Sequence, residues 1–134
     1  MRQITVTRAV LTVTALYGGV GGFIADWNTT HIHNPNWPPH AKFHNAQTMS
    51  LGAGLALLTL AVVWGGRGRW SASRLALATA LSSLYPATQL SALLYPGTAL
   101  VDDPDDRRGP QGYIAAGLLV LVAVVSLVER RRRP

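Results

Sequence analysis

The stretch LGAGLALLTLAVVWGG, residues 51–66, contains no Asp, Glu, Lys, Arg or His. Residues 75–101 and residues 113–128 share this composition. A helix of a soluble domain alternates apolar and polar faces, whereas a helix surrounded by lipid is apolar all round. Charged residues make up only 13% of the 134-residue chain, about half the share in a soluble domain. The sequence therefore predicts an integral membrane protein.

A fourth apolar stretch, residues 9–25, follows Arg2 and Arg8 and so resembles the hydrophobic region of a signal peptide. A cleaved signal peptide precedes a soluble mature domain, but here three more apolar stretches follow. We therefore expect this stretch to be a retained first helix.

Four helices are predicted, over residues 7–25, 39–64, 73–94 and 111–128. Pro39 suits the first turn of the second helix, and Gly65-Gly66 ends it. Pro86 lies inside the third helix, where we expect a kink. The predicted fold class is all-α, an integral membrane four-helix bundle forming a single domain over residues 1–134.

Basic residues gather at one end of this bundle. They lie before the first helix, between the second and third, and after the fourth: Arg2, Arg8, Arg67, Arg69, Arg74 and 130–133. The positive-inside rule makes this end cytoplasmic and places both termini there. The net charge of +6 therefore reflects topology and attraction to lipid rather than nucleic-acid binding, because no aromatic–basic surface motif accompanies it. A multi-pass protein of the cell membrane is expected, and the Ala-, Leu-, Arg- and Gly-rich composition suits a bacterial inner membrane.

All four histidines lie within fourteen positions of one another, His31 and His33 in the loop after the first helix and His40 and His44 at the start of the second. His40 and His44 are four positions apart, so they share a face if the second helix begins at Pro39. Asp26 ends the first helix just before this segment. We expect these groups to form a site at the non-cytoplasmic face.

Further polar and aromatic residues fall at the same depth in the membrane. Polar side chains within a membrane face the bundle interior and pair there, so a polar pocket is predicted. Its expected wall consists of His31, His33, Trp37, Asn45, Gln47, Thr48, Tyr85, Gln89 and Tyr113.

Three functions fit this pattern, and the residues alone leave open whether the chain is an enzyme. In an acid–base enzyme of isomerase or hydrolase-like type, His40 and His44 would act on a small lipophilic molecule, with Asp26 as the orienting carboxylate. In a metal-binding protein, a transition metal (Zn, Fe or Cu) would be held by some of the residues His31, His33, His40, His44 and Asp26.

In the third function the chain is an accessory subunit of a larger membrane complex, or a homo-oligomer. Gly18-x-x-x-Gly22 and Gly52-x-Gly54 would then be docking surfaces. Interfacial histidines that only cap loops are the structural alternative to all three.

Two other features carry less information. The predicted loop between the third and fourth helices carries four aspartates, Asp102, Asp103, Asp105 and Asp106. Arginines follow them at once and the spacing is not that of an EF-hand, so we expect a solvated loop with internal ion pairs. Asp102 is a candidate to reach the pocket. The chain has no cysteine, which excludes disulfides and thiolate metal sites.

The run from Asp26-Trp-Asn28 through HNPNWPPHAKFHNAQ, residues 33–47, resembles the signature of an uncharacterised family of small four-helix membrane proteins of bacteria and fungi. In general plan the chain is also similar to the DoxX-like proteins. A second likeness of plan is to the sterol isomerases related to the emopamil-binding protein. This last resemblance implies an acid–base pocket for a lipophilic substrate, but only by architecture.

Overall fold

Four α-helices make up the fold in the computed structural model, which describes residues 5–66, 68–101 and 109–132. They are α1 (Val6–Asp26), α2 (Pro39–Gly65), α3 (Ala72–Ser91) and α4 (Pro110–Arg131), with a short 3-10 helix, η1 (Ala92–Leu94), after α3. The predicted all-α four-helix bundle is confirmed for the described part of the chain. The predicted third helix ended at Leu94, but its last turn tightens into η1.

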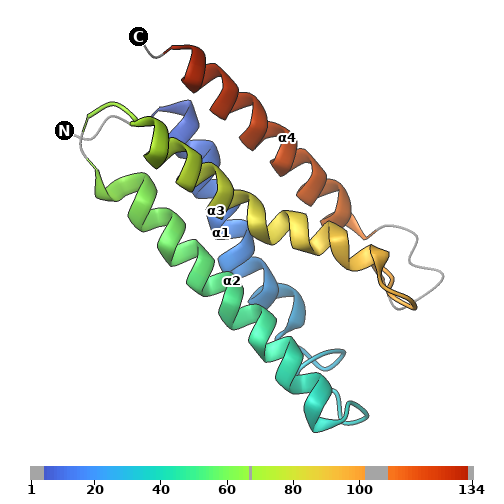
Figure 1. The fold of residues 1–134 in the computed structure, drawn as a ribbon. Helices are drawn as coiled ribbons and strands as arrows, with labels where there is room; N and C mark the ends of the chain where they lie inside the picture. Colours follow the sequence, from blue (N-terminus) through green and yellow to red (C-terminus); the bar gives the residue numbers. More distant parts are fainter. Residues whose placement is uncertain (1–4, 67, 102–108, 133–134) are drawn as a thin grey trace.

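The helices run alternately up and down, so the two chain ends lie at the same end of the bundle (Figure 1). Helices α1 and α3 each contact all three other helices, and α1 packs most extensively against α2. Among the described residues α2 and α4 make no contact with each other. They therefore form opposite flanks of the bundle, with α1 and α3 between them.

Three of the four helices, α1, α2 and α4, are long and apolar enough to cross a membrane. Their exposed surface is correspondingly apolar, with Leu57 70% and Val120 62% exposed. This identifies a membrane protein by the length and composition of its helices.

Helix α3 is less apolar because it contains several Ser and Thr residues. Several of these hydroxyls are paired within the protein: Ser83 Oγ donates to Thr79 O, and Thr79 Oγ1 lies 2.8 Å from Ser126 Oγ on α4. Such pairing lowers the free-energy cost of placing hydroxyls in hydrocarbon. A membrane-crossing α3 stays a prediction that this pairing supports, as does the assignment of the termini to the cytoplasm.

Glycines bring α1 and α2 into close contact. A Cβ added at Gly52 would collide with the Gly18 carbonyl oxygen, and one at Gly18 would lie 2.8 Å from Tyr85 Cγ of α3. A Cβ at Gly22 would meet the Tyr85 hydroxyl at 3.2 Å. The prediction that Gly18, Gly22 and Gly52 form an external docking surface is therefore wrong, because all three pack inside the bundle. Gly54 differs, since a Cβ there would meet nothing within 4 Å.

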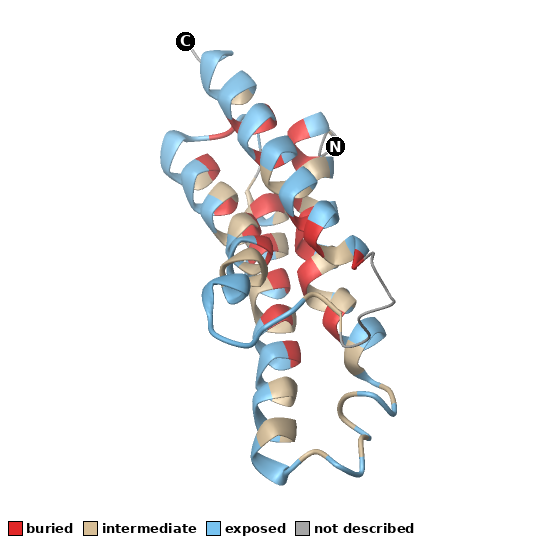
Figure 2. Ribbon diagram, turned by 90° about the vertical axis from the view of Figure 1, so that its right-hand side faces the viewer, coloured by how far each residue is buried: buried red, intermediate tan, exposed pale blue. Residues whose placement is uncertain are grey.

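The best-packed part of the core lies towards the end that carries the chain termini. Figure 2 shows buried residues along the inner faces of the helices and mostly exposed residues around the 27–38 loop. Leu11, Val63, Leu75 and Val122 are almost fully buried there. This packing fixes the bundle and leaves the histidine-bearing end comparatively open.

Arg8 is buried in this core, only 4% exposed. Its guanidinium lies 5.6 Å from the Trp70 ring centroid and donates to Gly68 O at 3.0 Å. The Arg74 guanidinium lies 4.5 Å from the same ring. Trp70 thus contacts two cations, which stabilises the connection between α2 and α3.

Candidate functional site

The loop between α1 and α2 is folded around Asn28. Its Oδ1 accepts hydrogen bonds from the backbone N–H of Thr30 at 2.9 Å and of His31 at 3.1 Å, and the His33 N–H donates to Asn28 O. An Asn side chain that bonds to the backbone two and three residues ahead makes a stable local turn. The loop therefore holds His31 and His33 in defined positions.

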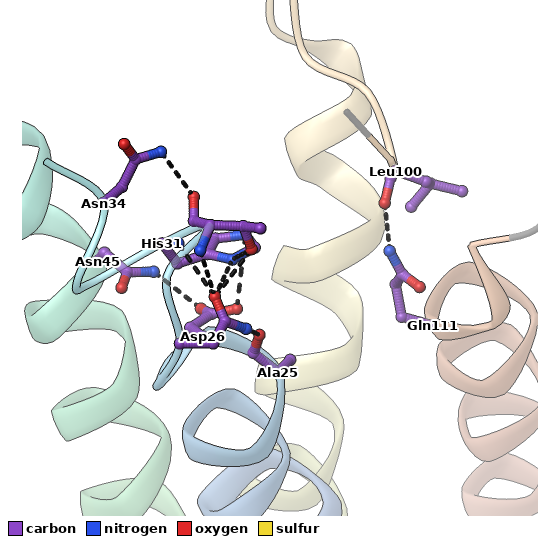
Figure 3. Close-up of polar contacts among 9 residues, drawn as sticks. Ala25, Asp26, His31, Asn34, Asn45, Leu100 and Gln111 are labelled. Carbon is purple, nitrogen blue, oxygen red and sulfur yellow. Dashed lines mark hydrogen bonds and ion pairs between the residues drawn. The ribbon is translucent and has the colours of Figure 1, made fainter. Parts of the chain in front are cut away.

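Asp26, the last residue of α1, connects this loop to α2. Asn45 Nδ2 donates to Asp26 Oδ2 at 2.8 Å, and His31 Nε2 lies 3.9 Å from Asp26 Oδ1 (Figure 3). A protonated His31 would form an ion pair with the carboxylate at this distance. Asn45 Oδ1 is buried and accepts no hydrogen bond from the described residues. Asp26, His31 and Asn45 form a three-residue group, which we call the Asp26 cluster.

The second polar group is a pair of imidazoles in the first two turns of α2. His40 Nε2 lies 3.1 Å from His44 Nε2, and the ring centroids are 4.5 Å apart. His44 Nδ1 lies 3.2 Å from the side-chain amide oxygen, Oε1, of Gln47. An amide oxygen only accepts, so in the neutral tautomer with the proton on Nδ1 His44 donates to Gln47 and presents its Nε2 lone pair to His40. Both imidazoles are exposed.

A third polar group lies deeper and was only partly predicted. Tyr17 of α1 donates to Gln89 Oε1 at 2.8 Å and to Gln111 O at 3.2 Å, which joins α1 to α3 and α4. Gln89 was among the predicted wall residues, whereas Tyr17 was not. A tyrosine hydroxyl in the middle of an apolar helix needs a hydrogen-bond partner. That requirement could have identified Tyr17 as a polar contact from the sequence.

The remaining predicted wall residues do not form one pocket. Trp37 packs edge-on against His31, and His33 packs in the same way against Trp27. Thr48 donates to His44 O within α2. Tyr113 is 79% exposed, because α4 turns its Gly112 and Ala115 face inward instead. The acidic loop, with Asp102, lies outside the described residues.

Tyr85 borders a small cavity between α1, α2 and α3, further from the loop. Thr14, Thr59 and Ser82 also line it, and its volume is about 10 Å³, which is room for about one water molecule. Ser82 Oγ, buried in this region, has no hydrogen-bond partner among the described residues. This cavity is far too small for a lipophilic substrate.

A family of unknown function, DUF6640, matches residues 10–134. The chain belongs to this family. No curated protein and no solved structure matches the chain. The match agrees with the resemblance to an uncharacterised family, whereas nothing supports the likeness to DoxX-like proteins or to sterol isomerases. Membership of DUF6640 brings no reaction or ligand with it, so the proposed function rests on the geometry of the polar groups.

In this DUF6640 protein the five predicted metal ligands divide into two pairs and one separate histidine. Asp26 lies with His31, and His40 lies with His44, while His33 stands apart against Trp27. Within residues 5–66, 68–101 and 109–132, no group of three or more His, Asp or Glu side chains could hold one ion together. The predicted catalytic trio is divided in the same way, because no hydrogen bond between described residues joins Asp26 to His40 or His44.

Proposed function

We propose that this membrane protein binds a divalent transition-metal ion at the membrane surface through His40 and His44. The observation that carries the proposal is the 3.1 Å separation of their Nε2 atoms. Metal–nitrogen bonds of about 2.0–2.1 Å, meeting at about 90–110°, separate two neighbouring ligands by about 2.8–3.4 Å. The two imidazoles are thus already spaced to coordinate one ion without a change of backbone.

Gln47 supports this arrangement from the next turn of α2. Its side-chain Oε1, 3.2 Å from His44 Nδ1, can accept only from an Nδ1–H. In that tautomer the Nε2 lone pair, which faces His40, is the one that would coordinate the ion. A metal-bound histidine usually donates its other ring N–H to such an oxygen, which fixes the tautomer and raises ligand basicity. The chemistry of the pair fits zinc, copper or iron, since imidazole binds all three.

The location of the pair suits an ion that comes from water. His40 and His44 are exposed, and Phe43 between them is 60% exposed. Trp27, Tyr95 and Tyr113 are also exposed, and aromatic side chains of this kind favour the membrane interface. The proposed ion therefore lies at the headgroup level, on the side that the positive-inside rule makes non-cytoplasmic.

The acid–base enzyme is less well supported by this geometry. That hypothesis needs Asp26 to orient His40 or His44, but Asp26 instead bonds Asn45 and approaches His31. Successive helix residues are about 100° apart around the axis, so Asn45 points about 100° away from His44 and about 140° away from His40. The carboxylate and the imidazole pair therefore face different sides of α2.

Zinc titration of the protein in mild detergent tests the proposal, using protein purified without a polyhistidine tag. We expect saturable zinc binding by calorimetry in the wild type and none in the His40→Ala/His44→Ala double variant. His33→Ala is the matched control, because this exposed histidine lies outside the pair, and it should bind zinc as the wild type does. Equal zinc binding by the double variant and the wild type would refute the proposal.

A further inference from the structure

We propose that the metal site is completed by a second copy of this chain, which packs in parallel against α2 across a two-fold axis. This inference rests on the proposed function, because it explains where the remaining ligands come from. Zinc in a closed site takes four ligands, and His40 and His44 supply two. Two copies would supply four imidazoles, all from the same face of α2.

The first support is the spacing of residues on the outer face of α2. Six residues lie along this face, and we call them the α2 seam: His40, His44, Gln47, Leu51, Gly54 and Leu58. Their separation along the chain alternates between four and three residues, which is typical of the contact face between two packed helices. The histidine pair is thus the outer end of a continuous stripe rather than an isolated feature.

The second support is that the α2 seam has no partner within the bundle. Helix α2 turns Met49, Gly52, Ala56 and Thr59 inward, on nearly the opposite side of the helix. Leu51 is 61% and Leu58 57% exposed. Because α2 forms one flank of the bundle (Figure 1), this face is directed away from the other helices.

Gly54 distinguishes the α2 seam from an ordinary lipid-facing surface. It lies between Leu51 and Leu58, and a Cβ there would meet nothing within 4 Å. Packing inside the bundle therefore does not require glycine at this position, in contrast to Gly18 and Gly52. A small residue between two leucines allows a neighbouring helix to approach closely in a membrane.

Symmetry determines which residues would meet. Both copies insert into the membrane with the same orientation, so a two-fold axis between them runs along the membrane normal. In such an isologous pair each residue of the seam meets its own equivalent near the axis. His40 and His44 of one copy then face the same two residues of the partner copy, at the level of the headgroups. An ion between them would be coordinated by four nitrogens.

Because the chain has no cysteine, single-cysteine variants can be cross-linked cleanly. Leu58→Cys places a thiol on the α2 seam, and Leu57→Cys is the matched control, also exposed but about 100° away around the helix. With a short bis-maleimide we expect dimers from Leu58→Cys, at several-fold higher yield with zinc present, and few from Leu57→Cys. The zinc effect should vanish when His40→Ala/His44→Ala is added.

Metal stoichiometry and a glycine pair complete the test. We expect one zinc ion for every two chains, and we expect Gly54→Leu to lower both the cross-linking yield and the zinc affinity. Gly117→Leu on α4 is the control, because a Cβ there also meets nothing within 4 Å.

A monomer that binds one zinc per chain would overturn the paired site but leave the proposed metal binding intact. Cross-linking through Leu58→Cys without any zinc binding would overturn both.

Discussion

At the scale of single residues, the imidazole pair and the Asp26 cluster show what spacing can and cannot predict. The spacing of His40 and His44 on one helix face was sufficient to predict their contact, which the structure places at 3.1 Å. The partner of Asp26 was not predictable in this way. Asn45 reaches it from α2, and that contact depends on how closely α1 and α2 approach.

Gln47→Ala should weaken zinc binding without abolishing it. The substitution removes the acceptor for His44 Nδ1–H, and losses of this kind cost about 10–100-fold in metal affinity. Calorimetric titration measures the effect. Thr48→Ala is the control, because its hydroxyl donates to the backbone oxygen of His44 within α2 and to no other described residue. An unchanged affinity in Gln47→Ala would show that the amide does not support the site.

Asp26→Ala should lower stability and leave zinc binding unchanged. It removes the acceptor of the Asn45 side chain and leaves that partly buried amide unpaired, which costs about 1–3 kcal/mol. Thermal unfolding in detergent measures the loss, and titration of the same variant measures zinc affinity. A fall in affinity comparable to that of His40→Ala would instead make Asp26 a ligand.

At the scale of secondary structure, apolar stretches and helix-breaking residues predicted the helices almost to their ends. Pro39 begins α2 and Gly65 ends it, as expected. The packing of the helices was harder to predict from one sequence, because the same Gly-x-x-x-Gly spacing serves an internal and an external contact equally well. Only the neighbours of Gly18, Gly52 and Gly54 in the structure separate the two cases.

Gly52→Leu should disrupt the contact between α1 and α2. A side chain at this position meets the Gly18 backbone and the Tyr85 ring, and overpacking of this kind costs about 1–3 kcal/mol or more. Thermal unfolding in detergent should show a clearly lower midpoint. The same substitution at Gly117 of α4, where a Cβ also meets open space, should not lower the midpoint. Equal midpoints in the two variants would contradict the described packing.

At the scale of the whole molecule, the bundle has a well-packed end and an open end with different properties. The end near the chain termini contains the buried core cluster that includes Leu11, Val63 and Leu75. At the opposite end the imidazole pair is exposed. The positions of Asp26 and the four histidines predicted a polar site at one end of the bundle. The division of the polar side chains into separate groups was not predictable, because it depends on how the four helices pack against one another.

Zinc should raise the midpoint of thermal unfolding of the wild type, because a ligand that binds the folded state stabilises it by mass action. Lowering the pH should remove this effect, since protons compete with the metal for the same imidazole nitrogens. Magnesium, which prefers oxygen ligands, is the control ion and should have no effect. A zinc effect that persists in the His40→Ala/His44→Ala variant would place the ion elsewhere.

The most direct test of the proposed metal binding is an X-ray absorption spectrum of the zinc-loaded protein at the zinc edge. We predict nitrogen ligands at about 2.0–2.1 Å, with the outer-shell scattering of imidazole rings. This imidazole signal should be absent from the His40→Ala/His44→Ala variant. A wild-type spectrum with only oxygen ligands, or one identical to that of the double variant, would contradict metal binding by His40 and His44.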